Sequence, residues 1–274
     1  MLRSILLAAV LACITPATAM ADSSRQIIDV HIHYSHDAWT SLPPPEAIKV
    51  LREARLKKAF VSSSSDDGTQ MLYKAAPDLI VPVLRPYRAR GETGTWTRDP
   101  SIIAHVEGRL KANKYAGIGE FHAYGADADT EVMKRMVELA KQYKIFLHAH
   151  SDADAVERMF KHDPNATVLW AHSGFAQVDN VREMLAKYKN LWADLAFRSD
   201  QAPSGKLDAA WRKLFLDYPE RFMVGTDTYV PERWHYVVEN ATYSRKWLDE
   251  LPDEVADNIA YRNAERLAAW ALGQ

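Results

Sequence analysis

Two histidines, His31 and His33, end an apolar run over residues 27–33 and carry side chains that can bind a metal. Alternate side chains of a β-strand point to opposite faces, so two histidines separated by one residue point the same way. Two neutral imidazoles that converge from one strand end can bind a divalent metal. Two core histidines bonded to the backbone would show the same spacing, so His-x-His alone does not decide between the two interpretations.

Ionisable residues also end four later apolar runs that read as β-strands. These residues are Glu120 and His122, His148 and His150, His172, and Asp227. Only three of the ten histidines fall clearly within predicted helices, namely His105, His162 and His235. Imidazoles and carboxylates gathered at strand ends form a constellation of metal ligands.

Short β-rich runs alternate with amphipathic stretches along the chain, and this alternation predicts the fold. The predicted strands are residues 26–33, 58–62, 79–85, 115–121, 145–150, 167–172, 191–197 and 221–226. The predicted helices are residues 46–57, 67–76, 101–113, 130–143, 152–161, 178–189 and 207–217, followed by 232–251 and 255–272. Eight such units indicate an α/β fold, a (β/α)8 TIM-type barrel of one domain, in which the carboxyl ends of the strands face one cavity. A doubly wound open sheet normally has fewer strands, and no glycine-rich first turn supports it here.

The start of the chain predicts export. A positive residue, a short apolar run and small residues up to Ala21 are typical of a secretory signal peptide over residues 1–21, which leaves residues 22–274 as the barrel domain. Cys13 lies in this leader, and a lipoprotein site that leaves Cys13 lipidated is the alternative to cleavage after Ala21. We therefore expect a periplasmic or secreted protein with no transmembrane segment beyond the leader.

Composition narrows the class of partner. The net charge of −2 gives no electrostatic sign of nucleic-acid binding, and 47% hydrophobic residues suffice for a sizeable core. The least regular stretch, residues 86–100, predicts a long loop that leaves the third strand on the side of the cavity. These features favour an enzyme or a binding protein for small molecules.

Taken in order, the motifs resemble the amidohydrolase superfamily of metal-dependent hydrolases, and most closely its amidohydrolase-2 and TatD-type branches. The matching pieces are residues 29–33, 119–120, 150–151, 172–174, 225–227 and 261–267. This resemblance covers nearly the whole chain after the leader and implies a distorted barrel with one or two divalent ions at its mouth. The histidinol-phosphatase-like PHP family also opens with His-x-His, but the last two pieces argue against it.

The resemblance implies roles for six residues. His31, His33 and Asp227 would hold the more buried ion, His150 and His172 the second ion, and Glu120 would bridge the two. Asp227 would also be the general base for a metal-activated hydroxide that attacks a carbonyl or phosphoryl centre. If Glu120 is a structural carboxylate instead, the site holds one ion, as in some amidohydrolase-2 decarboxylases. Zinc is the expected metal, with manganese, iron or nickel as alternatives.

Residues around these six have more than one interpretation. His148 shares a strand face with His150, so either could be the ligand while the other lies in the core, behind the ligands or against the substrate. His122 could contact the substrate. Arg85, like the loop arginines after it, could bind an anionic substrate group or be solvated. Asp194 and Arg198 point toward the mouth or form an internal ion pair.

We therefore expect an exported metal-dependent hydrolase that cleaves an ester, lactone, amide or phosphoester bond of a small molecule. One rival is a single-metal decarboxylase, which is a lyase. Another is a non-catalytic metal-binding barrel, whose mark would be a missing ligand. The sequence leaves the substrate and the oligomeric state open.

Overall fold

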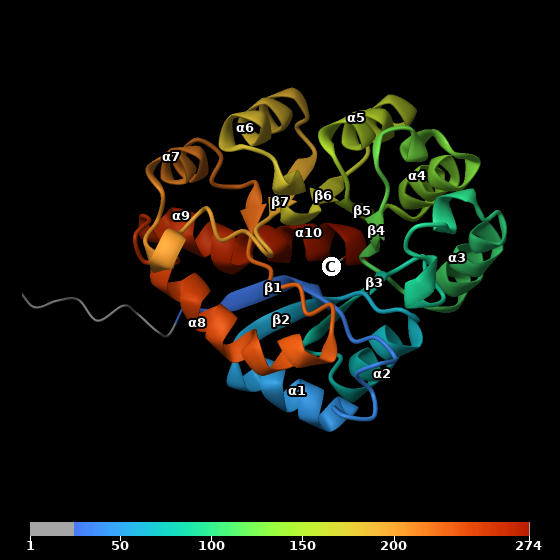
Figure 1. Cartoon of the computed structure of the whole chain (residues 1–274), viewed down its shortest axis with the longest axis horizontal. Coiled ribbons are helices and arrows are strands. Elements are labelled where there is room, and N and C mark those ends of the chain that lie inside the picture. Colours follow the sequence, from blue (N-terminus) through green and yellow to red (C-terminus); the bar gives the residue numbers. More distant parts are fainter. Residues whose placement is uncertain (1–24, 274) are drawn as a thin grey trace, which may run out of the picture.

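A ring of eight parallel strands forms the centre of the computed structural model, which describes residues 25–273 (Figure 1). Each strand pairs with the next along the chain: β1 (Ile27–Ile32), β2 (Leu56–Val61), β3 (Ile80–Leu84), β4 (Gly117–His122), β5 (Phe146–His150), β6 (Val168–Trp170), β7 (Leu191–Asp194) and β8 (Phe222–Met223). The Val30 N–H donates to the Val224 carbonyl (3.0 Å) and the Asp227 N–H donates to the His31 carbonyl (2.8 Å), which ties the end of β8 back to β1. The predicted (β/α)8 barrel is confirmed.

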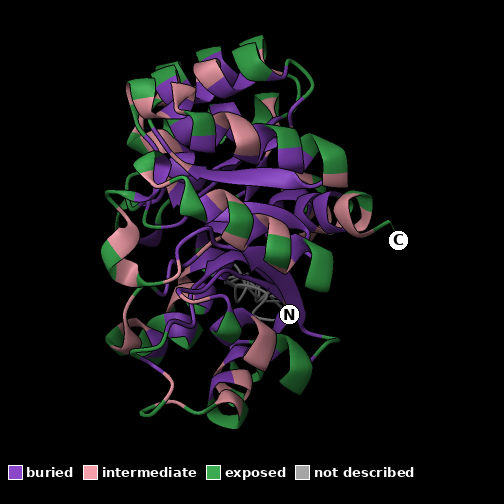
Figure 2. Ribbon diagram, turned by 90° about the vertical axis from the view of Figure 1, so that its right-hand side faces the viewer, coloured by how far each residue is buried: buried purple, intermediate pink, exposed green. Residues whose placement is uncertain are grey.

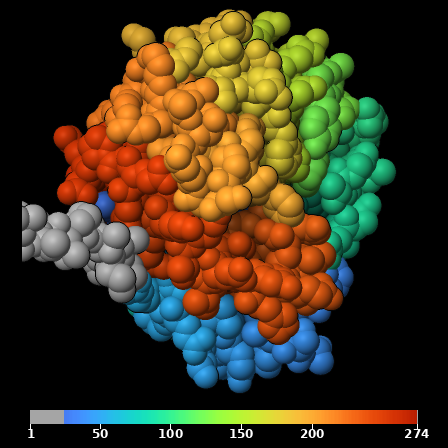
Figure 3. Space-filling view, turned by 60° about the vertical axis from the view of Figure 1, so that its left-hand side comes forward, coloured from blue at the N-terminus to red at the C-terminus, as the bar shows by residue number. Residues whose placement is uncertain are grey.

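Helices follow the strands in turn and form the outer layer of the barrel. They are α1 (Pro44–Glu53), α2 (Asp67–Ala75), α3 (Ser101–Ala112), α4 (Glu131–Tyr143), α5 (Ala153–His162), α6 (Val178–Lys187), α7 (Ala209–Asp217) and α8 (Val237–Leu248). Figure 3 shows the blue N-terminal part of the chain lying against its orange-red C-terminal part, and α1 packs against α8. The outer layer therefore closes in the same place as the strands.

Helix α4 illustrates why these segments are helical. The Thr130 hydroxyl accepts a hydrogen bond from the Met133 N–H (3.3 Å), which caps one of the free amides at the start of the helix. The apolar stripe of α4 is buried, while charged residues such as Lys134 and Glu138 occupy the outer side. Figure 2 shows the same division across the barrel, with buried strands in the middle and helices that are exposed on their outer faces.

The amino end of the barrel is closed by the last helical segment. This segment comprises α9 (Asp253–Asp257), a π-helical turn (Asn258–Arg262) and α10 (Asn263–Leu272), which lies across the ring in Figure 1. Leu267 and Ala268 of α10 pack with inward-facing strand residues such as Ile28 and Phe146 in one apolar cluster. The Asn263 side-chain amide donates to the Phe222 carbonyl (2.7 Å). Among residues 25–273, this segment therefore covers the amino end of the barrel.

Several boundaries differ from the prediction for identifiable reasons. The first helix ends at Glu53, not at residue 57, because Arg55 has a left-handed backbone (φ +55°) and Leu56 pairs with Ile27 in the sheet. The helix predicted from residue 232 begins at Val237, after a 3₁₀ turn that Pro231 opens. The long loop at 86–100 contains two 3₁₀ turns, and Trp96 anchors it by donating to the His122 carbonyl (2.8 Å).

The predicted signal peptide and Cys13 lie outside the described residues. Within residues 25–273, no helix combines the length and the hydrophobicity that crossing a bilayer requires.

Candidate metal centre

A β-bulge in β1 aims the first two histidines into the mouth of the barrel. Asp29 pairs with Ala59 of β2, but the next pair is Ile32 with Val61, so β1 carries one extra residue between the two pairs. Such a bulge changes which face the following side chains occupy. Val30 therefore faces the apolar interior below, and His31 and His33 both lie above it at the carboxyl end.

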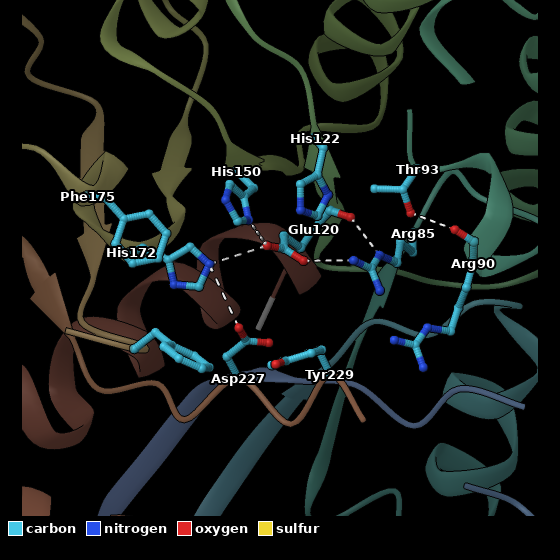
Figure 4. Close-up of a pocket in the computed structure, with 11 residues that line it drawn as sticks. Arg85, Arg90, Thr93, Glu120, His122, His150, His172, Phe175, Asp227 and Tyr229 are labelled. Carbon is cyan, nitrogen blue, oxygen red and sulfur yellow. Dashed lines mark hydrogen bonds and ion pairs between the residues drawn. The ribbon is translucent and has the colours of Figure 1, made fainter. Parts of the chain in front are cut away.

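Five of the six candidate ligands converge on one point at the floor of a cavity, and Figure 4 shows three of them, Glu120, His172 and Asp227. His31 and His172 each approach Glu120 Oε1 through Nε2 at 3.5 Å, and His33 Nε2 lies 3.2 Å from Glu120 Oε2. Asp227 lies opposite, with its carboxylate oxygens 3.7 Å from His31 Nε2, 3.4 Å from His33 Nε2 and 4.0 Å from His172 Nε2. These atoms come from the end of β1 and the residue after it, from β4, and from the loops after β6 and β8, as expected of strand ends in a barrel.

The three histidines of this group are oriented by hydrogen bonds at their other ring nitrogen. His31 Nδ1–H donates to Asp194 Oδ2 (3.0 Å), His33 Nδ1–H to the Ser62 carbonyl (2.6 Å) and His172 Nδ1–H to the Ala196 carbonyl (2.9 Å). A proton on Nδ1 leaves a lone pair on Nε2. All three Nε2 atoms are buried and have no hydrogen-bond partner among the described residues. Buried unpaired nitrogens facing two carboxylates are the donor set of a cation site.

The charge balance of the group also fits a divalent cation. Burial lowers the pKa of His31, but the negative charges of Asp194, Glu120 and Asp227 outweigh burial and raise that pKa well above its usual value. Three buried carboxylates therefore demand positive charge at this point, and Arg85 is the arginine that pairs with one of them, Glu120. A divalent cation can supply the positive charge that Arg85 does not provide.

His150 and His148 occupy different layers of the site. His150 lines the cavity, points Nδ1 at Glu120 Oε1 (2.7 Å) and stacks on His122, with 4.1 Å between ring centroids. His148 lies deeper, is buried, and donates from Nε2 to Asp194 Oδ2 (2.9 Å). Burial lowers the pKa of His148 to about 4, so its ring is neutral. Of the two, His150 is the one placed to bind a metal, while His148 is separated from the cavity.

Asp194 holds this deeper layer together, which the sequence left undecided. Besides His31 and His148, its carboxylate accepts hydrogen bonds from the backbone N–H groups of His172 (2.8 Å) and Ala196 (3.0 Å). Burial alone would raise the pKa of Asp194, but the charge of His31 and the hydrogen bonds from both imidazoles bring it far below its ordinary range. The ion pair of Asp194 with Arg198 is not formed among the described residues, because Arg198 pairs with Asp200 (2.6 Å).

The arginines after β3 are already paired to different degrees. Arg85 bonds both the Oε2 (2.9 Å) and the backbone carbonyl (3.0 Å) of Glu120, so it supports a candidate ligand as well as lining the cavity. Arg90 also lines the cavity and pairs with Asp37 from the loop after β1. His122 accepts a hydrogen bond from the Tyr87 hydroxyl (3.0 Å), and burial lowers its pKa to about 3, so it faces the cavity as a neutral ring.

The cavity above these groups has a volume of about 340 Å³ and two unlike walls. Arg85, Arg90, Thr93 and His122 form the polar wall, and Phe175, Phe197 and Tyr229 form an aromatic wall. The three aromatic rings are 52%, 46% and 43% exposed at the rim. A small molecule with both polar and apolar parts could enter and reach the group at the floor. The two phenylalanines and Tyr229 were not among the residues that the sequence singled out.

Comparisons with known proteins agree with this architecture. The sequence profile of the family described as "Amidohydrolase" matches residues 28–267. No curated protein sequence matches the chain. Among solved structures, an uncharacterized TIM-barrel protein from Bordetella bronchiseptica is 15% identical, with 91% of this chain and 100% of that chain covered and a TM-score of 0.66.

Two further structures share the fold at similarly low identity. A probable 2-pyrone-4,6-dicarboxylic acid hydrolase from Acinetobacter baumannii is 12% identical, with 89% of this chain and 99% of that chain covered and a TM-score of 0.60. A TatD homologue from Escherichia coli K12 is 16% identical, with 90% and 98% covered and a TM-score of 0.58. The family profile spans most of the described barrel, including all the candidate ligands, and the chain therefore belongs to the amidohydrolase family.

Proposed function

We propose that this protein is an exported metal-dependent hydrolase that cleaves an ester, lactone, amide or phosphoester bond of a small molecule. The observation that carries the proposal is the set of three buried, unpaired Nε2 atoms of His31, His33 and His172 opposite Glu120 and Asp227. This set of atoms lies at the floor of the cavity, and the family comprises metal-dependent enzymes. Both facts support a catalytic role for a bound ion. The signal-peptide pattern at residues 1–21 supports export to the periplasm or the medium.

His31, His33, His172, Asp227 and Glu120 would hold the ion, and His150 could contribute to a second one beside Glu120. A divalent cation at this place supplies Lewis acidity, which lowers the pKa of water and polarises a carbonyl or phosphoryl oxygen. Zinc suits imidazole and carboxylate ligands, and manganese, iron and nickel are the alternatives.

Asp227 is the residue best placed to move a proton. Burial alone would raise the pKa of Asp227, but the positive charge of His31 and the close contact with His33 lower it to about 2, so the carboxylate is ionised. It lines the cavity, and the hydrogen bond from its N–H to the His31 carbonyl fixes its backbone beside β1. In the proposed reaction one Asp227 oxygen accepts a proton from the attacking water and returns it to the leaving group.

A single-metal decarboxylase is the second candidate, because the contacts of Glu120 fit a site with one ion. The nitrogen–oxygen separations of 3.2–4.0 Å around Glu120 and Asp227 suit ligands of one ion, because metal bonds of about 2.0–2.2 Å set neighbouring ligand atoms at such separations. Arg85 also occupies Oε2 of Glu120, so one oxygen of this carboxylate is already committed.

The test is elemental analysis of the purified protein, followed by a screen of esters, lactones, amides and phosphodiesters with the metal removed and restored. The hydrolase proposal expects bound divalent metal and a hydrolytic activity that is lost with a chelator and regained with the metal. Release of carbon dioxide from an aromatic or unsaturated acid would favour the lyase instead. A protein that binds no divalent metal would contradict both candidates. Sequencing of the amino terminus of the mature protein tests cleavage after Ala21.

A further inference from the structure

Two of the candidate ligands stand in a backbone conformation that side chains other than glycine rarely adopt. His172 and Asp227 both have a φ of +56°, in the left-handed region. His172 opens a run of four such residues that ends at Phe175, and Asp227 lies in the loop after β8. Because this conformation is unfavourable for a residue with a Cβ atom, the surrounding structure has to hold it in place.

One arginine donates hydrogen bonds to the backbone at each of these two ligands. Arg198 donates from Nη1 to the His172 carbonyl (3.2 Å) and from Nη2 to the Ala176 carbonyl (2.9 Å). Arg233 donates from Nε to the Asp227 carbonyl (2.5 Å) and from Nη2 to the Thr226 carbonyl (2.8 Å). In both cases the rigid fork of a guanidinium spans two carbonyls, one of which belongs to the ligand itself.

The two guanidinium groups are themselves fixed. Arg198 lies over the ring of Trp211, 4.7 Å from the centroid, and pairs with Asp200. Arg233 lies 4.1 Å from the centroid of Phe197, a residue of the aromatic wall, and has no carboxylate partner among the described residues. Its guanidinium is thus held by stacking on rings and by backbone carbonyls.

A second cavity of about 270 Å³ is lined by both arginines. Arg198, Arg233 and the edge of Phe197 line it, together with Thr226 and the side chain of Gln201. Phe197 lines both this cavity and the cavity above the candidate metal ligands, so it stands between them. A small cation such as free guanidinium could therefore reach the place of either side chain if that side chain were shortened.

We propose that Arg198 and Arg233 are positioning residues that hold His172 and Asp227 in the left-handed conformation needed to aim their donor atoms at the ion. This inference rests on the metal site of the proposed function. Neither arginine is among the candidate ligands. Each acts through the backbone of a ligand, as outer-shell partners of metal ligands commonly do through the side chain.

Arg221 provides a matched control elsewhere in the barrel. It also donates to backbone carbonyls, from Nε to Leu191 (2.8 Å) and from Nη2 to Tyr188 (2.5 Å). These carbonyls belong to the segment at the start of β7, away from the carboxyl ends of the strands. Loss of Arg221 therefore tests what an arginine clamp contributes to stability without touching a ligand.

The experiment measures Zn²⁺ affinity of the metal-free protein by competition with a chelator, alongside thermal unfolding of the same samples. We expect Arg233→Ala and Arg198→Ala to weaken Zn²⁺ binding by about 10–100-fold, the usual effect of removing an outer-shell partner. Arg221→Ala should bind Zn²⁺ as the wild type does, whatever it does to the melting temperature. Millimolar guanidinium should restore part of the lost affinity in Arg233→Ala, which a general loss of stability would not allow.

Lysine variants keep the proposal testable if an alanine variant fails to fold. Lysine retains the charge but not the fork, so Arg233→Lys and Arg198→Lys should fold and show an intermediate loss of affinity. Wild-type affinity in the alanine variants, or in the lysine variants where alanine does not fold, would overturn the positioning role. Absence of Zn²⁺ binding by the wild type would instead contradict the proposed metal site itself.

Discussion

The two sides of the candidate metal centre differ in how their side chains are held. On one side, His31, His33 and His172 each bond a fixed acceptor through Nδ1 and leave a buried Nε2 unpaired. On the other side, Glu120 and His150 bond each other (2.7 Å), and Glu120 is further tied to Arg85. The Nε2 atoms of the first side would gain a partner when a cation binds. On the second side, Glu120 and His150 already have partners within the protein.

This difference predicts an order of binding. A donor set whose lone pairs are already aimed loses little freedom when a cation binds, so the ion next to the three histidines should be held tightly. A second ion would have to break the hydrogen bond between His150 and Glu120 before it could bind there. The second ion should therefore be weaker or absent, and each prediction below tests one part of this contrast.

The largest effect is expected at Asp227, which faces both sides. Asp227→Asn keeps the size of the side chain but removes the charge and the ability to accept a proton. We expect kcat to fall by about 10²–10⁴-fold, the usual contribution of a positioned acid or base. Steady-state kinetics at saturating Zn²⁺ separates this loss from a loss of metal. A near-normal kcat for the variant on a verified substrate would show that Asp227 is not the base.

The contrast between the two sides is tested most directly by metal content. His31→Ala removes one of the three unpaired Nε2 atoms, here called the aimed nitrogens, and should yield protein with little or no bound metal after dialysis. His150→Ala leaves all three aimed nitrogens in place and should retain one ion per chain. Elemental analysis of both variants against the wild type measures the difference. Equal losses in the two variants would mean that the sides act as one unit.

A smaller effect is expected at Asp194, which orients His31 through a hydrogen bond to its Nδ1 atom. Asp194→Asn can place an amide N–H₂ group, which cannot accept, where Oδ2 now accepts from both His31 and His148. Zn²⁺ affinity should fall by about 10–100-fold, with a lower melting temperature because the hydrogen bonds of both imidazoles to Oδ2 are lost. Competition titration measures the affinity. An unchanged affinity would show that the hydrogen bond from His31 to Asp194 is not needed to orient the His31 ring.

The fold and most of the candidate ligands could be predicted because each depends on local pattern. Alternating apolar runs gave eight strands, and the barrel rule then placed Glu120, His150 and Asp227 at one end without any knowledge of contacts. The orientation of His31, on the side of the three histidines, could not be predicted from local pattern alone. The bulge that turns His31 depends on a pairing shift against β2, and a single sequence carries no signal for such a shift.

The support of the site was harder to predict for the same reason. Asp194 looked equally suited to Arg198, and its true partners, His31 and His148, come from strands that are far away in the sequence. The left-handed backbone at His172 is not signalled by glycine, which stands two positions later at Gly174. Nonlocal hydrogen bonds decide both cases, and sequence spacing does not record them.

The smallest effect is expected at the rim, where the second side meets solvent. Arg90 lines the cavity, and its carboxylate partner, Asp37, is partly exposed. For a substrate with an anionic group, Arg90→Ala should raise KM up to about fivefold with kcat unchanged, because exposed ion pairs contribute about 0.2–1 kcal/mol. Arg88→Ala is the matched control, since Arg88 pairs with Glu92 and Asp99 outside the cavity. Salt should shrink the difference between wild type and Arg90→Ala, because it screens exposed charges. Equal KM values at low salt would leave Arg90 with a role only in joining its loop to Asp37.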